Sequence, residues 1–311
     1  MTSVLPLLLH LLVAFLAVAT TLAILFPRRP VVGVPQHWGL QLWQLSLLAA
    51  IAGFLLIDWR AAALSVAVGA YWSWRLWPRR SPRDATAEAT PLLRLVAANL
   101  LYKNLDFERT LQGLAAFEAD VLVLCEVTPE ARRYFRRLEA SYPHALDTCA
   151  SENLYGILIL SRFPLMPRSS GVGEDPTPRH LAADLSIGAV TVSLVAIHPT
   201  NPLRFSRAHR IPVEFDAVAQ LCRAAQGDLI VTGDCNAAGW SSYLRDLEQG
   251  AGLANDGKMR PSWPIWLPPL VRLPLDHVWV RGRVALLKVG LGPRLGSDHL
   301  PLIAEIGWRD K

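Results

Sequence analysis

The chain opens with three long apolar segments and continues with short apolar runs separated by polar stretches. A helix needs about 20 apolar residues to cross a bilayer, and the ends of these segments are rich in tryptophan, which favours the headgroup level. The sequence therefore predicts three transmembrane helices within residues 1–77, at 4–26, 39–57 and 61–77.

The first segment could instead be a cleaved signal peptide. However, it has no basic residues before its apolar run, and it is longer than the apolar part of a typical signal peptide. We therefore expect residues 4–26 to stay in the mature protein. Residues 78–90 are polar and contain proline and alanine, which indicates a linker.

Short apolar runs alternate with amphipathic stretches from residue 92 onward, a pattern typical of strands interleaved with helices. The linker leaves residues 91–311 for a single large domain with its own core. We predict strands at 92–98, 120–125, 154–160, 180–186, 189–197, 228–233 and 275–281.

Charge is distributed unevenly along the chain, which is 52% hydrophobic and only 18% charged. Residues 1–84 contain seven basic and two acidic side chains, whereas the remaining residues contain 24 of each and are neutral. A broad nucleic-acid-binding surface would be expected to carry net positive charge, so the neutral domain counts against one. A local basic groove remains open.

The same charges predict an orientation in the membrane. With three spans, the first loop and the segment after the third span lie on one side, which carries five arginines, whereas the other side carries only Arg60. By the positive-inside rule, we expect an integral protein of the cell inner (plasma) membrane whose large domain is cytoplasmic.

Polar residues follow the predicted strands at the points where the apolar runs end. Strand ends present side chains to a site at the edge of a sheet, so a succession of such residues favours one shared site. Taken singly, each has a simpler explanation, such as a helix-terminal acid, a turn or an N-cap. The residues concerned are Asn99, Glu126, His198, Asp234, Asn236, Asp276, Asp298 and His299.

These motifs, in this order, resemble the endonuclease/exonuclease/phosphatase superfamily. The resemblance covers most of residues 92–308 and rests on RLVAANLL, DVLVLCEV, ILILSRFPL, VAIHP, VTGDCNA, LDHVWV and GSDHLPL. It implies an α/β fold, a four-layer α/β/β/α sandwich, here preceded by three transmembrane helices as in the membrane-tethered bacterial members. The implied activity is metal-dependent hydrolysis of phosphoesters.

The resemblance also implies a metal site. A phosphoester resists attack because its oxygens are negative, so a hard cation with oxygen ligands must offset the charge. The family pattern points to Glu126 as the principal ligand, with Asn99 beside it and Asp298 close enough to hold the metal or its waters. We expect Mg²⁺, with Mn²⁺ as an alternative.

The remaining motif residues receive catalytic roles from the same resemblance. His299 would act on the phosphate or the attacking water, oriented by Asp276. Asp234 would activate water or serve the leaving group, Asn236 would fix the nucleophile, and His198 would contact the phosphoryl group.

Two departures from the family pattern are visible. Leu101 occupies a position where some family nucleases carry an acid, and Asn104 is either a substitute ligand or a loop residue. Cys235 lies inside the GD-x-N motif, and we expect it to pack in the core. The four cysteines show no C-x-x-C spacing, which speaks against a disulfide framework or a zinc site.

Two further groups are candidates for substrate binding. Arg204, Arg207 and Arg210 recur at every third position, so on a helix they would share a face that could grip phosphate, although a solvated face explains them equally well. Trp263 and Trp266 lie in a proline-rich segment that ends near Asp276. They either cover the core or sit at the bilayer surface beside the catalytic mouth.

These inferences favour a membrane-anchored, Mg²⁺-dependent hydrolase of a lipid-linked phosphate or phosphodiester. Its partners would be the bilayer and that substrate. Two alternatives remain: a metal-dependent nuclease, which would bind nucleic acid with a steep salt dependence, and an inactive membrane scaffold.

Overall fold

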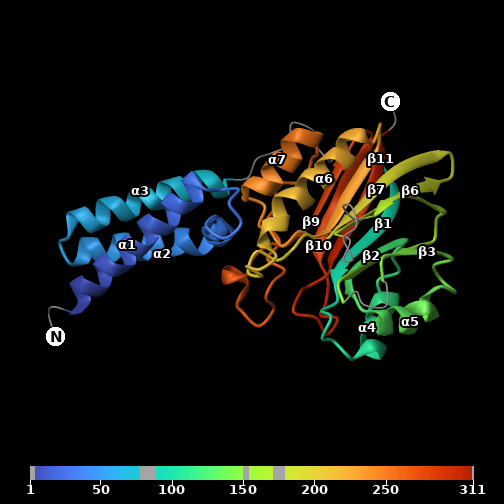
Figure 1. Ribbon diagram of the computed structural model, residues 1–311, viewed down its shortest axis with the longest axis horizontal. Helices are drawn as coiled ribbons and strands as arrows, with labels where there is room; N and C mark the ends of the chain where they lie inside the picture. Colours follow the sequence, from blue (N-terminus) through green and yellow to red (C-terminus); the bar gives the residue numbers. More distant parts are fainter. Residues whose placement is uncertain (1–3, 78–88, 150–153, 171–178, 310–311) are drawn as a thin grey trace.

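The computed structural model describes residues 4–77, 89–149, 154–170 and 179–309. Its amino-terminal part is a helical bundle that projects from a two-sheet domain, with the amino terminus at the far end (Figure 1). The bundle consists of α1 (Val4–Leu25), η1 (Val34–Trp38), α2 (Gly39–Leu55) and α3 (Trp59–Leu76).

Two helical segments are long and apolar enough to cross a membrane, Val4–Leu25 and Val34–Leu55. The prediction of a third span is wrong by this test, although α3 forms where that span was expected. Helix α3 contains Arg60 and Arg75 near its ends and is built largely from alanine, serine and tryptophan, so its mean hydropathy is lower than that of the other two. Most of the predicted linker, 78–90, lies outside the described residues, and its last two residues already belong to β1.

The strands form two sheets, with the orders β10-β11-β1-β2-β4-β3 and β5-β6-β7-β8-β9 in the described part of the chain. All seven predicted strands are confirmed, whereas β3, β5, β10 and β11 were not predicted. The bounds are β1 (Ala89–Asn99), β2 (Val121–Val127), β3 (His144–Asp147), β4 (Gly156–Ser161), β5 (Leu165–Ser170), β6 (His180–Ile187), β7 (Val190–Ile197), β8 (Leu229–Asp234), β9 (Asp276–Arg281), β10 (Val284–Leu291) and β11 (Leu302–Arg309).

The helices cover the outer faces of the two sheets. Successive side chains of a strand point to opposite faces, so in β1 Leu95 and Ala97 enter the core between the sheets, whereas Val96 and Ala98 pack on the helix side. The first sheet is covered by α4 (Phe107–Ala115), α5 (Pro129–Phe135) and η2 (Arg136–Leu138). The second is covered by α6 (Ile211–Ala224), preceded by η3 (Ala208–Arg210), and by α7 (Ser242–Ala251).

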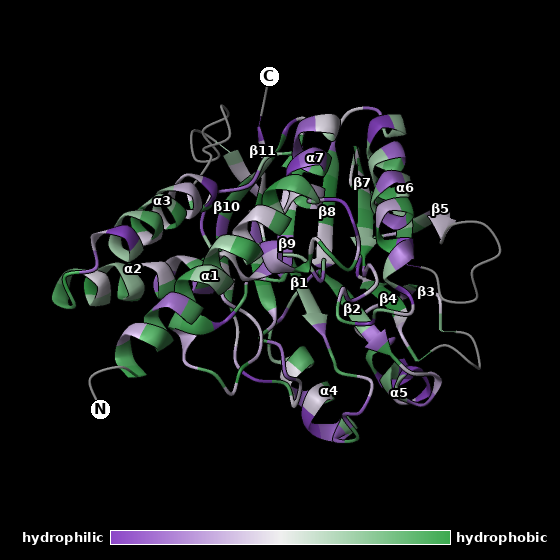
Figure 2. Cartoon of the chain, turned by 60° about the vertical axis from the view of Figure 1, so that its left-hand side comes forward, coloured by the Kyte–Doolittle hydropathy of each residue, from purple (hydrophilic) through white to green (hydrophobic). Residues whose placement is uncertain are grey.

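These layers make a four-layer α/β/β/α sandwich, as expected. Three apolar clusters correspond to the three interfaces between the layers. Figure 2 shows the hydrophobic strands inside and the hydrophilic residues on the outer surfaces of α4 and α5.

The bundle and the sandwich share a fourth apolar cluster, which we call the seam. From the bundle, Leu42 and Trp72 pack with Trp240, Leu273 and Leu275 of the sandwich. Gly39 lies where a Cβ atom would be 2.5 Å from the Trp72 ring and 2.8 Å from the Trp240 indole nitrogen, so only glycine fits this crossing. The bundle therefore packs directly against the sandwich, in addition to its covalent connection through the chain.

Polar contacts surround the seam. The indole of Trp240 donates to the backbone oxygen of Gln36 at 2.8 Å, and the Ser242 backbone N–H donates to the Gln36 side chain at 2.8 Å. Arg28 forms an ion pair with Asp246. The segment between α1 and α2 thus contacts α7 and the residues just before it.

Candidate active site

The predicted site residues meet at one end of the two sheets. Asn99 ends β1, and Glu126 lies near the end of its parallel neighbour β2. In the other sheet Asp234 ends β8, where it is the cross-strand partner of Asp276 in β9. Like charges directly opposite one another destabilise a sheet, so this pairing costs stability and points to a functional reason for it.

Backbone conformation at this end of the sheets is strained. Glu126, Asn236 and Leu101 have φ angles of 58°, 47° and 60°, in the left-handed region that favours glycine. Each such residue costs on the order of 1–3 kcal/mol, and such residues cluster at functional sites. At Glu126 the pairing of β2 with β4 also shifts register, so a bulge turns this side chain out of the ladder.

Asn99 connects two carboxylates. Its side-chain N–H₂ donates to Glu126 Oε1 at 3.1 Å and to Asp234 Oδ2 at 2.8 Å, and its oxygen accepts from the Leu101 backbone at 2.9 Å. Asn99 and Asp234 are buried, whereas the Glu126 side chain keeps 15% of its exposure. The least buried carboxylate is thus the one that can reach a ligand from outside.

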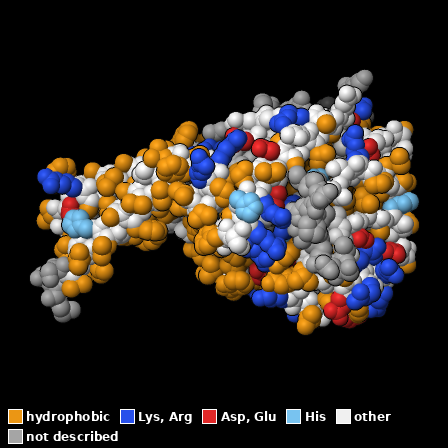
Figure 3. Space-filling model, viewed as in Figure 1, with side chains coloured by type: hydrophobic (Ala, Val, Ile, Leu, Met, Phe, Trp, Pro, Cys, Tyr) orange, Lys and Arg blue, Asp and Glu red, His pale blue; other side chains and the backbone are white. Residues whose placement is uncertain are grey.

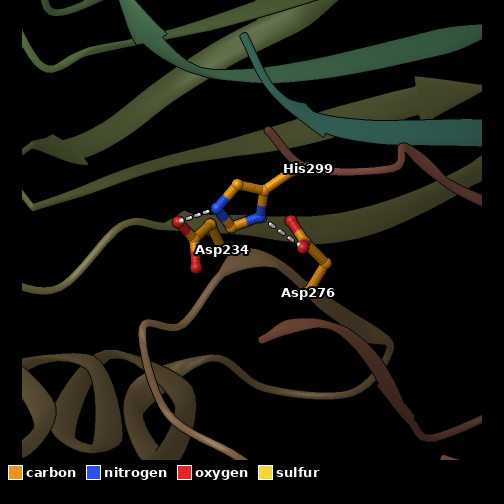
Figure 4. A group of neighbouring side chains, drawn as sticks. All are labelled: Asp234, Asp276 and His299. Carbon is orange, nitrogen blue, oxygen red and sulfur yellow. Dashed lines mark hydrogen bonds and ion pairs between the residues drawn. The ribbon is translucent and has the colours of Figure 1, made fainter. Parts of the chain in front are cut away.

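Asp276 and His299 form the expected pair, with His299 Nδ1 2.8 Å from Asp276 Oδ2 and Nε2 3.8 Å from Asp234 Oδ2 (Figure 4). Burial alone would lower the pKa of His299, but the carboxylates of Asp276 and Asp234 outweigh it and raise the pKa to about 10. The ring is therefore an imidazolium at neutral pH. Burial raises the pKa of Asp234 above its ordinary value, and the His299 charge opposes that shift.

Asp298 lies on the His299 side of the site. Its Oδ2 accepts from the Trp263 indole N–H at 2.9 Å, its backbone oxygen accepts from Ile265, and its charge helps raise the pKa of His299. The Trp263 ring centre is 6.2 Å from that of His299. Trp263 is half-buried against the catalytic pair, whereas Trp266 is 67% exposed.

A polar pocket opens beside Glu126. His198 Nε2 lies 3.7 Å from both Glu126 Oε1 and Asp234 Oδ2. Burial lowers the pKa of His198 well below its ordinary value, and the nearby Arg179 adds to this, so its ring is neutral. Asn236 is held by a bond from its side chain to the Pro199 oxygen at 2.9 Å.

The sequence analysis missed Tyr155 and Arg179, which line this pocket together with Pro199 and Asn201. The guanidinium groups of Arg204 and Arg179 lie 4.5 and 5.4 Å from the centre of the Tyr155 ring. Arg179 is buried, with Nε 3.8 Å from a carboxylate oxygen of Glu214. No motif marks either residue, since both follow polar stretches that have no periodic pattern.

The expectation that Arg204, Arg207 and Arg210 share a helix face is wrong. Turns occupy residues 202–203 and 205–207, and only the short η3 precedes α6. Arg204 lines the pocket beside Glu126, whereas Arg207 is exposed and does not line it.

The alternatives for Asn104 and Cys235 are resolved by their contacts. The Asn104 side chain bonds Thr110 and the Leu295 backbone and accepts from Asp106, which makes it a loop residue. Cys235 is fully buried in the core under α6 and α7, and burial raises the pKa of its thiol well above the ordinary value. It packs as expected.

The donor set fits a hard divalent cation. Within the described residues, Asp234, Asp276 and His299 bring potential ligand atoms within 4.8 Å of one another, but a protonated ring has no lone pair to offer a metal. The oxygens of Glu126 and Asn99 suit Mg²⁺ better. Asp276 Oδ1 is buried and accepts no hydrogen bond from the described residues. This carboxylate oxygen therefore remains available to a cation or its waters.

The raised pKa of His299 predicts a pH-dependent stability. The folded protein keeps the imidazole proton up to a pKa of about 10, whereas the unfolded chain releases it near about 6.5. The resulting stabilisation is complete below the unfolded value and is lost as the pH rises towards 10. We expect the melting temperature in chelator to fall between pH 7 and pH 10, and to fall less in Asp276→Asn. Equal slopes in the two proteins would contradict the assigned charge state.

A four-layer sandwich with buried carboxylates and a His-Asp pair at the ends of both sheets is typical of enzymes that hydrolyse phosphoesters. The model of the Endonuclease/Exonuclease/phosphatase family matches residues 96–299, from β1 to His299. The chain belongs to this family, whose members are phosphoester hydrolases that depend on divalent metal ions. None of the curated proteins that were compared matches the chain.

Solved structures share the fold. TDP2 of D. rerio, complexed with a single-strand DNA product, has a TM-score of 0.57 at 17% identity and covers 69% of this chain and 98% of its own. The 3'-5' exonuclease NExo of Neisseria meningitidis has a TM-score of 0.56 at 20% identity, over 69% and 100%. A Staphylococcus aureus beta toxin variant with bound magnesium ions has a TM-score of 0.53 at 15% identity, over 70% and 99%. At these identities the likeness shows the fold alone.

Proposed function

We propose that the protein is a membrane-anchored hydrolase of a lipid-linked phosphate or phosphodiester. The observation that carries the hydrolase assignment is the convergence of Glu126, Asn99 and Asp234 on the His299-Asp276 pair. Glu126 and Asn99 would hold Mg²⁺, or Mn²⁺ in its place, and Asp298 is a further candidate to bind the metal or its waters. When bound, the cation offsets the negative charge of the phosphoryl oxygens.

The protein's own groups divide the remaining work. The His299 imidazolium, fixed by Asp276, donates a hydrogen bond to a phosphoryl oxygen. Asp234 accepts a proton from the attacking water, since burial keeps its pKa above the ordinary value. Asn236 positions that water, and neutral His198 contacts the phosphoryl group from the pocket side.

Membrane anchoring is supported by the exposure of the bundle. In the most apolar stretch of Val4–Leu25 only 33% of the residues are buried inside the protein, and in that of Val34–Leu55 only 28% are. The core helix of a soluble protein, by contrast, is mostly buried. The visible face of the bundle is mostly apolar between the charged side chains at its outer end and the sandwich (Figure 3). Arg28 forms an ion pair with Asp246 of the sandwich, and α3 runs back along α2, so we propose that the domain lies on the side of the arginine-rich first loop. That side is cytoplasmic by the positive-inside rule.

The proposal of a lipid-linked substrate is supported by one segment that contacts both α2 and the active site. Gln41 and Gln44 of α2 donate at 2.8 Å to the backbone oxygens of Val271 and Leu270, around η4 (Pro269–Val271). The same segment carries Trp263, which holds Asp298, and the exposed Trp266. The segment thus contacts α2 at one end and Asp298 at the other, and we propose that Trp266 enters the headgroup region.

Replacing Trp266 by alanine tests the lipid-linked substrate. Removing a large apolar side chain from an interface costs about 1.5–3 kcal/mol, so we expect kcat/KM on vesicle-borne substrate to fall about tenfold. Activity on a short-chain soluble analogue should be unchanged. Trp263 is unsuitable for this purpose because its indole contacts Asp298.

Met166→Ala is the matched control, since Met166 is 65% exposed on β5, at the opposite edge of the sheet from β9. It should affect neither substrate. Equal losses on vesicles and on the soluble analogue in Trp266→Ala would reject interfacial binding.

A nuclease is the second candidate. The observation that favours it is that Arg179 and Arg204 both lie against the Tyr155 ring, because aromatic and cationic side chains bind single-stranded nucleic acid. The neutral charge of residues 85–311 opposes it. Tight DNA binding with a steep salt dependence would decide for the nuclease.

A further inference from the structure

The turns before α6 expose two large apolar side chains next to the active site. Leu203 is 43% exposed and Phe205 is 58% exposed. Arg204 stands between them in the sequence, lines the pocket beside Glu126 and lies over the Tyr155 ring. A single exposed apolar residue needs no explanation, but here two of them flank a residue of the pocket. The surface beside the pocket is therefore partly apolar.

Hydrogen bonds fix the conformation of these turns. The Leu203 backbone N–H donates to the Asn201 side chain at 2.9 Å, and the Arg204 N–H donates to the Asn201 backbone oxygen at 3.0 Å. The Arg207 N–H donates to the Arg204 oxygen at 2.8 Å. The two apolar side chains are thus held at the surface by the backbone, and burying them would break these bonds.

The first turn of α6 connects this surface with the bundle. Arg28 follows the end of α1 and lines a cavity together with Pro212 and Phe215 of α6. Val213, beside Pro212 in the chain, is 55% exposed. In Figure 1 the amino end of α6 lies on the side of the sandwich from which the bundle projects. The start of α6 is therefore at the level where α1 would leave the bilayer.

A bilayer surface fits this part of the molecule. Segments that lie at a bilayer surface combine apolar side chains, which enter the boundary between headgroups and acyl chains, with cations at the headgroup level. The exposed Arg207 places a cation close to Phe205 in the same turns. Figure 3 shows hydrophobic and basic side chains side by side where the bundle meets the sandwich. Because α1 ends beside this surface, the membrane that holds the bundle is the partner nearest to it.

We propose that residues 203–207 form a membrane-contact loop, in which Leu203 and Phe205 insert into the bilayer and Arg207 meets the headgroups. The inference rests on the membrane anchoring proposed above, and it adds a second lipid contact to that of Trp266. Since Arg204 lies between the inserted side chains and also lines the pocket, the loop brings the entrance of the active site to the bilayer surface.

The test places an environment-sensitive fluorophore on a cysteine introduced into the loop. The full-length chain is reconstituted into vesicles of phosphatidylcholine and phosphatidylglycerol, with or without spin-labelled lipid. The label on Phe205→Cys should be quenched by about half, because interfacial side chains reach about 5–10 Å into the boundary of headgroups and acyl chains. Leu203→Cys provides the second position, should the first variant not fold. Quenching at neither position would overturn the loop.

Met166→Cys is the matched control for the label. Met166 is an exposed apolar residue on β5, whose neighbour β6 lies on the side of the sandwich away from the bundle in Figure 1. Its label should not be quenched, and equal quenching there would overturn the assignment to the loop. The wild-type chain treated in the same way gives the background, because Cys149 alone of its four cysteines is partly exposed.

The quenching is independent of the proposed substrate. Phe205→Cys combined with Glu126→Gln should keep it, and its loss there would overturn a contact that needs no catalysis. Quenching in a protein that hydrolyses only soluble phosphoesters would reject the lipid-linked substrate and support the loop. Hydrolysis of vesicle-borne substrate without quenching would reject only the loop. Extraction of the chain from membranes by alkaline carbonate would reject the anchoring and, with it, both proposals.

Discussion

Glu126→Gln is expected to lower turnover by roughly 10³-fold and to raise the metal concentration needed for half-maximal activity. The substitution keeps the shape of the side chain but removes the charge that a divalent cation needs, and neutralising phosphoryl charge is worth several kcal/mol in such sites, about 1.4 kcal/mol per tenfold. The melting temperature should change little, because the hydrogen bonds of Glu126 within the described part of the chain are those from Asn99 and the Tyr102 backbone.

The measurement is the initial rate as a function of Mg²⁺ and Mn²⁺ concentration, on a short-chain phosphodiester. Glu130→Gln provides the control, because it is the same substitution four residues further on, at an exposed position in the first turn of α5. It should leave the rate and the metal requirement as they are. Unchanged activity in Glu126→Gln would remove this residue from the metal site.

Asp276→Asn and His299→Gln are each expected to lower turnover by roughly 10³-fold, and the double variant should be little worse than either one. The two side chains share a 2.8 Å contact, and the Asp276 charge contributes to the raised pKa of His299. Residues that act as one unit give non-additive losses. The double-mutant cycle in turnover is the measurement.

Metal binding should be retained in all three variants, because Glu126 and Asn99 are unchanged. Losses that multiply in the double variant would show that the two residues act independently. A large loss of metal affinity in His299→Gln would instead make the ring a ligand, against the assigned imidazolium.

The sequence predicted the central strands because they are apolar and end in polar residues. Strands β1, β2, β7 and β8 are buried on both faces over most of their length, and their sequences are mostly apolar. The missed strands β3 and β5 lie at the sheet edges, where β3 has four residues and β5 contains Pro167. Edge strands bury less apolar surface, so their sequences carry a weaker pattern.

The sequence predicted those site residues that belong to the family's motifs, which follow one another in a fixed order along the chain. Asp276 and His299 are 23 positions apart, and only the family order suggested that they meet. Tyr155 and Arg179 carry no motif, and the spacing of Arg204 and Arg207 suggested a helix where the chain forms turns. Such loop conformations depend on tertiary contacts that residue spacing does not encode.

The seam determines what happens when the chain is cut between the bundle and the sandwich. Leu273, Leu275 and Trp240 are covered by helices of the bundle, and Arg28 and Gln36 add polar contacts. Proteolytic cleavage between residues 77 and 89 would leave the two pieces associated, much as the chains of a heterodimer are. Under the proposed membrane anchoring, a single cut would therefore not release the sandwich from the membrane, and replacing the bundle by an unrelated anchor would expose a hydrophobic surface of the sandwich.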